Sequence, residues 1–385
     1  MVSFEIVSLV AFATVIGLWL LSDRKNKEMT FKYGFIIRRW TKGLELIDKV
    51  VSSHPRLITI VGNIGIGIGV LAGLGGLAVL IYLTINLQQA FQLVLPTAGG
   101  YQIPGPVISI PFWYWLTAIF IIVVTHESMH AVFARLENVK VKNYGILMLL
   151  LLPIGAFVDP DEKRIKKLGT IKKLRIFAAG SLANFITAII GVIVLISSVF
   201  LFTSATKNMG VAIESVEPGS PADKAGLEGT ITEINAIKIN NSLDFAKALN
   251  STKAGDTLDI TTDRGVYKLA LEIHPKNENR TYMGVSIRNA FSFDVFGLQG
   301  IVSSVFYSVF FTVISFLNWL IVISAGVGTV NMLPMKPLDG GLFFEEIFTK
   351  VFGDNGKKLI LVSSYLILGL LLLNLFGLPL LKSIL

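Results

Sequence analysis

Residues 111–136 read PFWYWLTAIFIIVVTHESMHAVFARL. The stretch is apolar over about twenty residues, the length that an α-helix needs to cross the hydrocarbon core of a membrane. Ionisable residues inside such a helix are costly and usually functional, and here His126, Glu127 and His130 stand close together. The sequence therefore predicts a transmembrane helix that carries a polar site.

Five other apolar runs have a similar length and lie at about 2–22, 57–86, 176–203, 300–333 and 358–381. Of the 385 residues, 53% are hydrophobic and 16% are charged, and the mean hydropathy is +0.68. These values exceed what a soluble domain needs. We expect a polytopic α-helical membrane protein with about six transmembrane helices. The first run lacks a basic leader and a cleavage site, so it is interpreted as a retained span.

Lys and Arg flank the apolar runs unevenly. Residues 23–56 contain nine of them and residues 135–175 contain ten, whereas residues 86–111 contain none. The positive-inside rule places the first two segments in the cytoplasm and the third outside. The N-terminus and the insert near 207–290 are then outside. We expect anionic membrane lipids, and no nucleic acid, as partners of these charges.

Two apolar segments carry more specific signals. In the second run, the pairs Gly65/Gly69 and Gly69/Gly73 favour close helix packing over a phosphate-binding loop. Residues 144–158, YGILMLLLLPIGAFV, are too short to span a bilayer and are interrupted by Pro153 and Gly155. Because both flanks are assigned to one side, we expect a re-entrant hairpin or loop beside the site, the alternative being an interfacial segment without a catalytic part.

The composition changes over residues 207–290, where Gly, Pro, Asn and Asp become frequent. GVAIESVE, TLDITTD and VYKLALEI alternate like strands, and SLDFAKALN has the pattern of a helix. A small α/β domain is predicted here. The expected organisation is a membrane part over 1–206, this domain over 207–290, and a second membrane part over 291–385.

HESMH at 126–130 matches the HExxH pattern of zinc metalloproteases. Positions i and i+4 share one helical face, so both imidazoles can reach one Zn²⁺ at about 2.0–2.1 Å. Glu127 lies on the same turn, where it can act as a general base. His54 and His274 are interpreted as interfacial or loop residues. A chance match remains the alternative for so short a motif, and its position in an apolar span argues against chance.

A catalytic zinc site usually has three protein ligands, and the chain has no cysteine. The best third candidate is Asp339, in NMLPMKPLDGG at 331–341, where prolines and glycines are expected to stop the helix. The alternative is a solvated Asp in a turn. Asn184 carries an amide within the fourth apolar run. Its side chain either forms a hydrogen bond between helices or donates to the oxyanion of the reaction.

Helix rise allows the depth of these residues to be compared. Counted from an outer aromatic belt at 113–115, His126 lies about 20 Å inward. Counted from the cytoplasmic boundary near Arg175, Asn184 lies about 14 Å in. The two estimates agree on a level nearer the cytoplasm.

Taken together, these motifs resemble the site-2 protease family of intramembrane zinc metalloproteases. HESMH, GSLAN at 180–184 and NMLPMKPLDGG match its HExxH, G-x-x-x-N and LDG patterns, although the proline often found after the first glycine of GSLAN is missing. The resemblance implies one Zn²⁺ bound by His126, His130 and Asp339. It also implies that Glu127 activates water, that Asn184 lies near the oxyanion, and that Asn331 holds an unwound substrate strand.

The family also implies a biological setting. Its members cleave transmembrane proteins within the bilayer, and EPGSPADKAGL at 217–227 resembles part of the PDZ domain that many of them carry outside the membrane. No clear GLGF loop is visible, so peptide capture and steric exclusion of bulky ectodomains remain open. A substrate helix must unwind before cleavage, and residues 144–158 could pair with it by strand addition. The compact size favours a prokaryotic plasma membrane.

Two alternatives belong to other functional classes. A transporter or channel also uses broken helices and intramembrane acids, but the chain shows no two-fold internal repeat. An inactive scaffold that presents a PDZ module would be expected to lose the glutamate of HExxH, and Glu127 is present.

Overall fold

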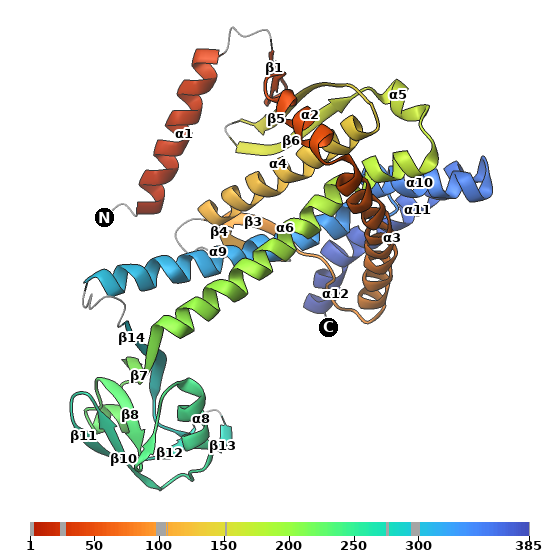
Figure 1. Cartoon of the computed structure of the whole chain (residues 1–385). Helices are drawn as coiled ribbons and strands as arrows, with labels where there is room; N and C mark the ends of the chain where they lie inside the picture. The colour runs from red at the N-terminus through yellow and green to blue at the C-terminus, as the bar shows by residue number, and fades with distance from the viewer. Residues whose placement is uncertain are drawn as a thin grey trace. The chain divides into compact units, whose positions relative to one another are not determined.

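A computed structural model describes residues 4–23, 28–97, 105, 107–150, 152–274, 277–293 and 301–384 (Figure 1). The chain divides into two compact units. Unit 1 contains residues 1–195 and 314–385, and unit 2 contains residues 196–313. The long helices α6 (Thr170–Ala205) and α9 (Ile301–Asn331) contribute residues to both.

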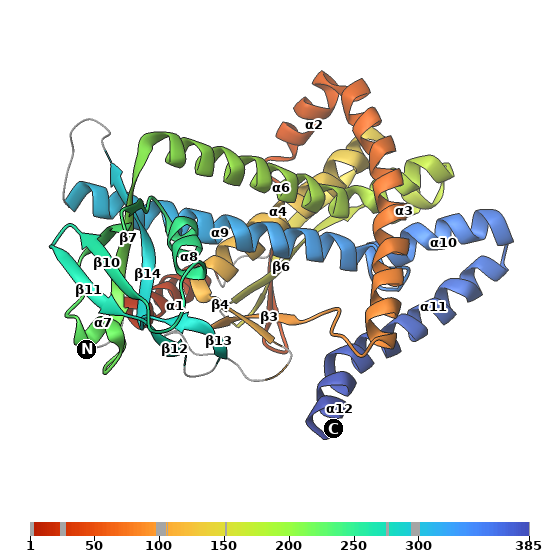
Figure 2. The same ribbon diagram turned by 90° about the horizontal axis from the view of Figure 1, so that it is seen from below.

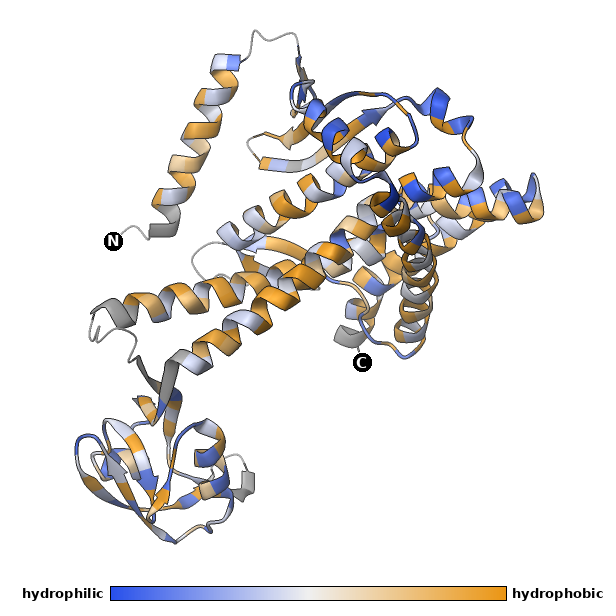
Figure 3. Ribbon diagram, in the orientation of Figure 1, coloured by the Kyte–Doolittle hydropathy of each residue, from blue (hydrophilic) through white to orange (hydrophobic). Residues whose placement is uncertain are grey.

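Within the described residues, five helices are long and apolar enough to cross a membrane: Pro55–Ile85 (α3), Phe112–Leu136 (α4), Thr170–Ser204 in α6, Val305–Asn331 in α9, and Asn355–Leu381. The last comprises α11 (Asn355–Leu372), the π-helical segment η1 (Leu373–Gly377) and part of α12 (Leu378–Ile384). Hydrophobic residues dominate them in Figure 3. The first predicted span forms α1 (Phe4–Asp23), whose apolar part, Val7–Asp23, is shorter. The chain is a multi-pass membrane protein.

Buried glycines line one face of α3, at positions 62, 65, 69, 73 and 76. A Cβ at Gly65 would lie 2.7 Å from Leu182 of α6, and one at Gly73 would lie 2.4 Å from the Met332 carbonyl oxygen and from Phe344 of α10 (Asp339–Phe352). Both ribbon views show α3 beside α10 (Figures 1 and 2). The close packing predicted for these glycines is confirmed.

Residues 144–158 form most of an antiparallel hairpin of β5 (Val141–Leu149) and β6 (Leu152–Pro160), in which Tyr144 pairs with Val158. Residues 29–40 add a second hairpin, β1 (Met29–Lys32) and β2 (Phe35–Trp40), and β2 pairs with β5. The strand order β1-β2-β5-β6 leaves β6 at an edge, and β6 also contacts α4. The predicted hairpin is confirmed, and its entry into the membrane stays a prediction.

Smaller elements complete unit 1. They are α2 (Leu44–Ser53), α5 (Glu162–Lys166) and a parallel pair of β3 (Leu93–Thr97) and β4 (Val107–Pro111). The core that matters most for function joins Ala131, Phe133 and Ala134 of α4 to Ala179 and Leu182 of α6. The alanines allow the two helices to approach closely, and the larger apolar side chains fill the space between them.

Unit 2 contains the predicted small α/β domain. Its main sheet follows the order β11-β10-β8-β7-β14 with β9 on β8, and β12 and β13 pair separately. The strands are β7 (Thr206–Val216), β8 (Thr230–Ile234), β9 (Ile237–Lys238), β10 (Thr257–Thr262), β11 (Val266–Ala270), β12 (Glu272–His274), β13 (Asn277–Tyr282) and β14 (Val285–Phe293). The helices are α7 (Pro221–Lys224) and α8 (Ser242–Asn250), and Asn241 caps α8 by accepting bonds from two backbone N–H groups.

Candidate metal centre and active site

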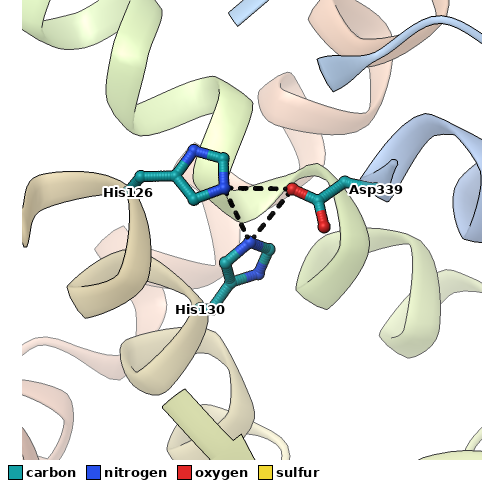
Figure 4. A group of neighbouring side chains, drawn as sticks. All are labelled: His126, His130 and Asp339. Carbon is teal, nitrogen blue, oxygen red and sulfur yellow. Dashed lines mark hydrogen bonds and ion pairs between the residues drawn. The ribbon is translucent and has the colours of Figure 1, made fainter. Parts of the chain in front are cut away.

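Two imidazoles of α4 and one carboxylate of α10 converge in unit 1 (Figure 4). His126 Nε2 lies 3.3 Å from His130 Nε2. Asp339 Oδ2 lies 3.1 Å from His126 Nε2 and 3.2 Å from His130 Nε2. Among the described residues, this is the group of His and carboxylate side chains spaced to hold a metal ion. The structure therefore brings together the three ligands that the sequence predicts.

These distances can be tested against zinc. Two ligand atoms about 2.0–2.1 Å from a tetrahedral ion are about 3.3 Å apart, which agrees with the three separations above. Burial by itself raises the pKa of Asp339, but attraction to His130 and hydrogen bonds to both imidazoles hold that pKa well below its usual value. Asp339 is therefore a carboxylate, the form that binds a cation. The donor set fits Zn²⁺.

The orientation of His130 is set by the backbone of α6. His130 Nδ1 lies 2.8 Å from the carbonyl oxygen of Ile176. A carbonyl oxygen only accepts hydrogen bonds, so Nδ1 carries the proton and donates it. When Nε2 gives up its own proton, as metal binding requires, its lone pair points to the side of the site where Asp339 lies. Hydrogen bonding of the second nitrogen is the usual way in which a metal-binding histidine is oriented.

Gly180 provides the space beside the two imidazoles. A Cβ at this position would lie 2.2 Å from His126 Nε2 and 2.5 Å from His130 Nε2. No side chain fits there. Because Gly180 and Asn184 are four residues apart on α6, they face the same direction, one leaving room and the other bringing an amide. The G-x-x-x-N pattern thus has a steric explanation in this chain.

Asp339 reaches the site through a break between two helices. α9 ends at Asn331, residues 332–338 form turns, and α10 begins at Asp339. The predicted role of the glycines needs a correction. Gly340 and Gly341 do not stop a helix but lie in the first turn of α10, where a Cβ would come within 2.3 Å and 2.6 Å of the backbone of the preceding turns. They allow α10 to pack directly on that break.

Glu127 lies next to the hairpin. Its Oε2 accepts a hydrogen bond of 3.0 Å from the backbone N–H of Val158 in β6. Residues 144–158 were predicted to lie beside the site, and this contact shows that they do. The bond anchors one carboxylate oxygen to the edge strand and leaves Oε1 as the second oxygen of the group.

The other predicted site residues have different positions. Asn184 is fully buried, and its Nδ2 lies 3.1 Å from His126 Nδ1, on the ring nitrogen opposite to the one near Asp339. Asn331 is half-buried at the end of α9, and in the described residues no hydrogen bond joins its side chain to the three ligands. His54 is exposed between α2 and α3.

Two backbone groups of the site were not anticipated, the Ile176 carbonyl and the Val158 N–H. Neither carries a side-chain signature that a sequence can reveal. The sequence gives one indirect indication of them. It predicts a hairpin beside the site, and the edge of a hairpin strand carries backbone N–H groups that can reach a side chain.

Comparison with known proteins agrees with this geometry. The sequence model of peptidase family M50 matches residues 114–373, which include every residue of the candidate centre. An uncharacterized protein of Methanocaldococcus jannaschii is 29% identical over 87% of this chain and 83% of its own length. A Clostridium acetobutylicum protein named "Putative zinc metalloprotease" is 24% identical over 62% of this chain and 86% of its own length.

A Thermotoga maritima protein of the same name is 26% identical over 44% of this chain and 38% of its own length. The family match covers more than half of the chain, and it includes both halves of the centre described above. The chain belongs to peptidase family M50, the site-2 protease family, and is a zinc metalloprotease.

Proposed function

We propose that this chain cleaves transmembrane proteins within the bilayer and acts in regulated intramembrane proteolysis. The observation that carries the proposal is the convergence of His126, His130 and Asp339 within 3.3 Å of one another, with both histidines on a helix able to cross a membrane. A hydrolytic centre on such a helix acts on peptide bonds that lie within lipid.

The proposed roles follow from the contacts. His126, His130 and Asp339 hold one Zn²⁺, which when bound supplies Lewis-acid activation of water and of the scissile carbonyl. Glu127 is held by Val158 through Oε2. It takes a proton from the attacking water at Oε1 and later delivers it to the leaving amine, as a general base and then a general acid.

The substrate segment is proposed to bind along β6. Among the described strands, none pairs with the outer edge of β6, and the same edge supplies the Val158 N–H to Glu127. An unwound segment that pairs with this edge satisfies its backbone groups and passes next to the catalytic carboxylate. Asn331, at the end of α9, is proposed to hold the same segment by its amide.

An apolar cavity favours a transmembrane substrate. It measures about 360 Å³ and lies between α1, α4 and the β5–β6 hairpin, with Phe12, Ile16, Phe120, Val124, Met148 and Ala156 in its lining. Apolar side chains of a substrate helix can occupy it without the desolvation cost that polar side chains would incur. It borders β6, the strand proposed to receive the unwound segment.

Sidedness belongs to the same proposal. The distribution of Lys and Arg supports a site nearer the cytoplasm and a PDZ-like domain at 207–290 outside a prokaryotic plasma membrane. That domain either binds a peptide or excludes bulky ectodomains. Anionic lipids are the partners proposed for the basic segments.

The function is tested by measuring zinc content and cleavage of a transmembrane substrate in detergent or proteoliposomes. Glu127→Gln should keep about one zinc per chain and lose about 10²-fold or more in turnover, because it removes the base but no ligand. His126→Ala should lose both. Ser128→Ala, an exposed position on the same turn, is the matched control and should keep both. Undiminished cleavage by Glu127→Gln would contradict the proposal.

A further inference from the structure

Asn184 has an unusual position for a group that contacts a reacting carbonyl. Its side chain is completely buried, and its Nδ2 faces His126 Nδ1 at 3.1 Å. Its Oδ1 is buried and has no hydrogen-bond partner among the described residues. The two ends of the carboxamide have nearly the same shape, so Asn184 can present either its nitrogen or this oxygen to the His126 ring.

The proton on the His126 ring decides which arrangement is present. As the atoms lie, Asn184 Nδ2 donates to His126 Nδ1, and a neutral ring must then carry its proton on Nε2, where it can donate to Asp339 Oδ2 at 3.1 Å. A protonated Nε2 has no lone pair for a metal.

Metal binding requires the opposite tautomer. Nε2 must then offer its lone pair, and Nδ1 must carry the proton and find an acceptor. A half-turn of the Asn184 carboxamide exchanges Nδ2 and Oδ1, so the unpartnered oxygen accepts from Nδ1. Only a side chain with both a donor and an acceptor can follow the imidazole through this change.

The second histidine has no such freedom. His130 Nδ1 faces the Ile176 carbonyl oxygen at 2.8 Å, and that oxygen accepts in every state. His130 is therefore fixed in the metal-binding tautomer by the backbone, whereas His126 depends on a side chain. This asymmetry identifies Asn184 as the adjustable part of the site.

The surroundings hold Asn184 in place for this role. Its own backbone carbonyl accepts a hydrogen bond of 2.8 Å from Ser324 Oγ of α9, and Ser324 is fully buried. A Cβ at Gly328 of α9 would lie 3.2 Å from the Asn184 Cβ. The backbone at 184 is thus fixed between α6 and α9, and rotation of the carboxamide is the movement that remains.

We propose that Asn184 is a positioning residue whose carboxamide holds His126 in its zinc-binding tautomer. The inference rests on the proposed zinc site at His126, His130 and Asp339. It differs from the oxyanion role suggested by the sequence motif, because the amide meets the ligand ring and not the substrate. The two roles make different predictions for zinc affinity.

The test is a zinc affinity measured by competition with a chromophoric chelator on the purified full-length protein. Asn184→Leu has a similar size but neither donor nor acceptor, and we expect it to bind zinc about 10- to 100-fold more weakly, as for lost partners of other zinc-bound histidines. Asn184→Asp keeps the acceptor that the zinc-binding tautomer needs, and we expect affinity within about threefold of wild type. Thr187→Val, one turn further along α6, is the control and should match wild type.

Several outcomes separate this inference from the proposed function. Wild-type zinc affinity in Asn184→Leu, with cleavage lost, overturns the positioning role and leaves the protease assignment standing. If Asn184→Leu does not fold, as judged by thermal unfolding, Asn184→Asp decides, and a loss of affinity beyond tenfold overturns the inference. Failure of the wild-type protein to bind zinc overturns the proposed function itself.

Discussion

At the scale of single residues, the site depends on an empty position as much as on its ligands. A Cβ at Gly180 would lie within 2.5 Å of the donor nitrogens of both histidines. We therefore expect Gly180→Ala to lose stoichiometric zinc, because the methyl group displaces at least one imidazole. Zinc content of the purified variant measures this directly.

The matched control for this prediction is Gly326→Ala on α9. A Cβ there meets no atom within 4 Å, so the substitution should leave zinc content unchanged. Zinc binding by Gly180→Ala equal to that of wild type would show that the imidazoles can move apart freely, which contradicts the tight packing described here.

Single residues also show what a sequence can reveal about such a site. His126 and His130 could be found because helical periodicity places i and i+4 on one face. Asp339 could be found because it follows two prolines at the end of an apolar run, in a segment that resembles the LDG motif of the family. The Ile176 carbonyl and the Val158 N–H could not be found, because every residue has the same backbone groups. The contact of Asn184 with the far nitrogen of His126 needed the actual helix rotation.

At the scale of elements, the edge of β6 is the part of the fold most open to test. Successive N–H groups of a strand point to opposite edges, so the Ala156 N–H points to the same side as that of Val158, which binds Glu127. Ala156→Pro removes this outward donor without removing a bond to β5. We expect KM for a transmembrane substrate to rise about twofold to tenfold, the equivalent of one hydrogen bond.

Ala156→Gly is the control for the strand-edge prediction, because it keeps the backbone N–H and puts no polar group into the apolar cavity that Ala156 lines. Zinc content should be the same in both variants, since neither touches a ligand. An unchanged KM in a folded Ala156→Pro would mean that substrate does not pair with this edge.

Only part of the four-stranded sheet could be predicted from the sequence. The β5–β6 hairpin was predictable because residues 144–158 are too short to span and contain Pro153 and Gly155. Its pairing with β2 was not, because strand register depends on contacts between segments about a hundred residues apart. The additional strands cover the β5 edge and leave β1 and β6 as the two edge strands of this sheet.

At the scale of the whole molecule, membrane sidedness is the main prediction. The chain has no cysteine, so single cysteines can be introduced without a background. Lys247 of α8 and Lys163 of α5 are both exposed. In intact cells, Lys247→Cys should react with a membrane-impermeant maleimide, and Lys163→Cys should react only after permeabilisation. The opposite pattern would invert the topology.

Composition made the membrane architecture predictable, since apolar runs of about twenty residues have few other uses. Within the described residues, five of the six predicted spans have helices long and apolar enough to cross a membrane, and the first predicted span forms the helix α1, Phe4–Asp23. Composition could not show that the helix break before Asp339 would pack against the glycines of α3, as the Gly73–Met332 approach does. That contact depends on complementary shapes from distant parts of the chain.

X-ray absorption of the purified protein tests most directly whether His126, His130 and Asp339 bind zinc. We expect about one zinc per chain with only nitrogen and oxygen ligands at about 2.0–2.1 Å, two of them imidazoles. Asp339→Ala should lose this signal. Retention of the same zinc spectrum and affinity in Asp339→Ala would contradict the account.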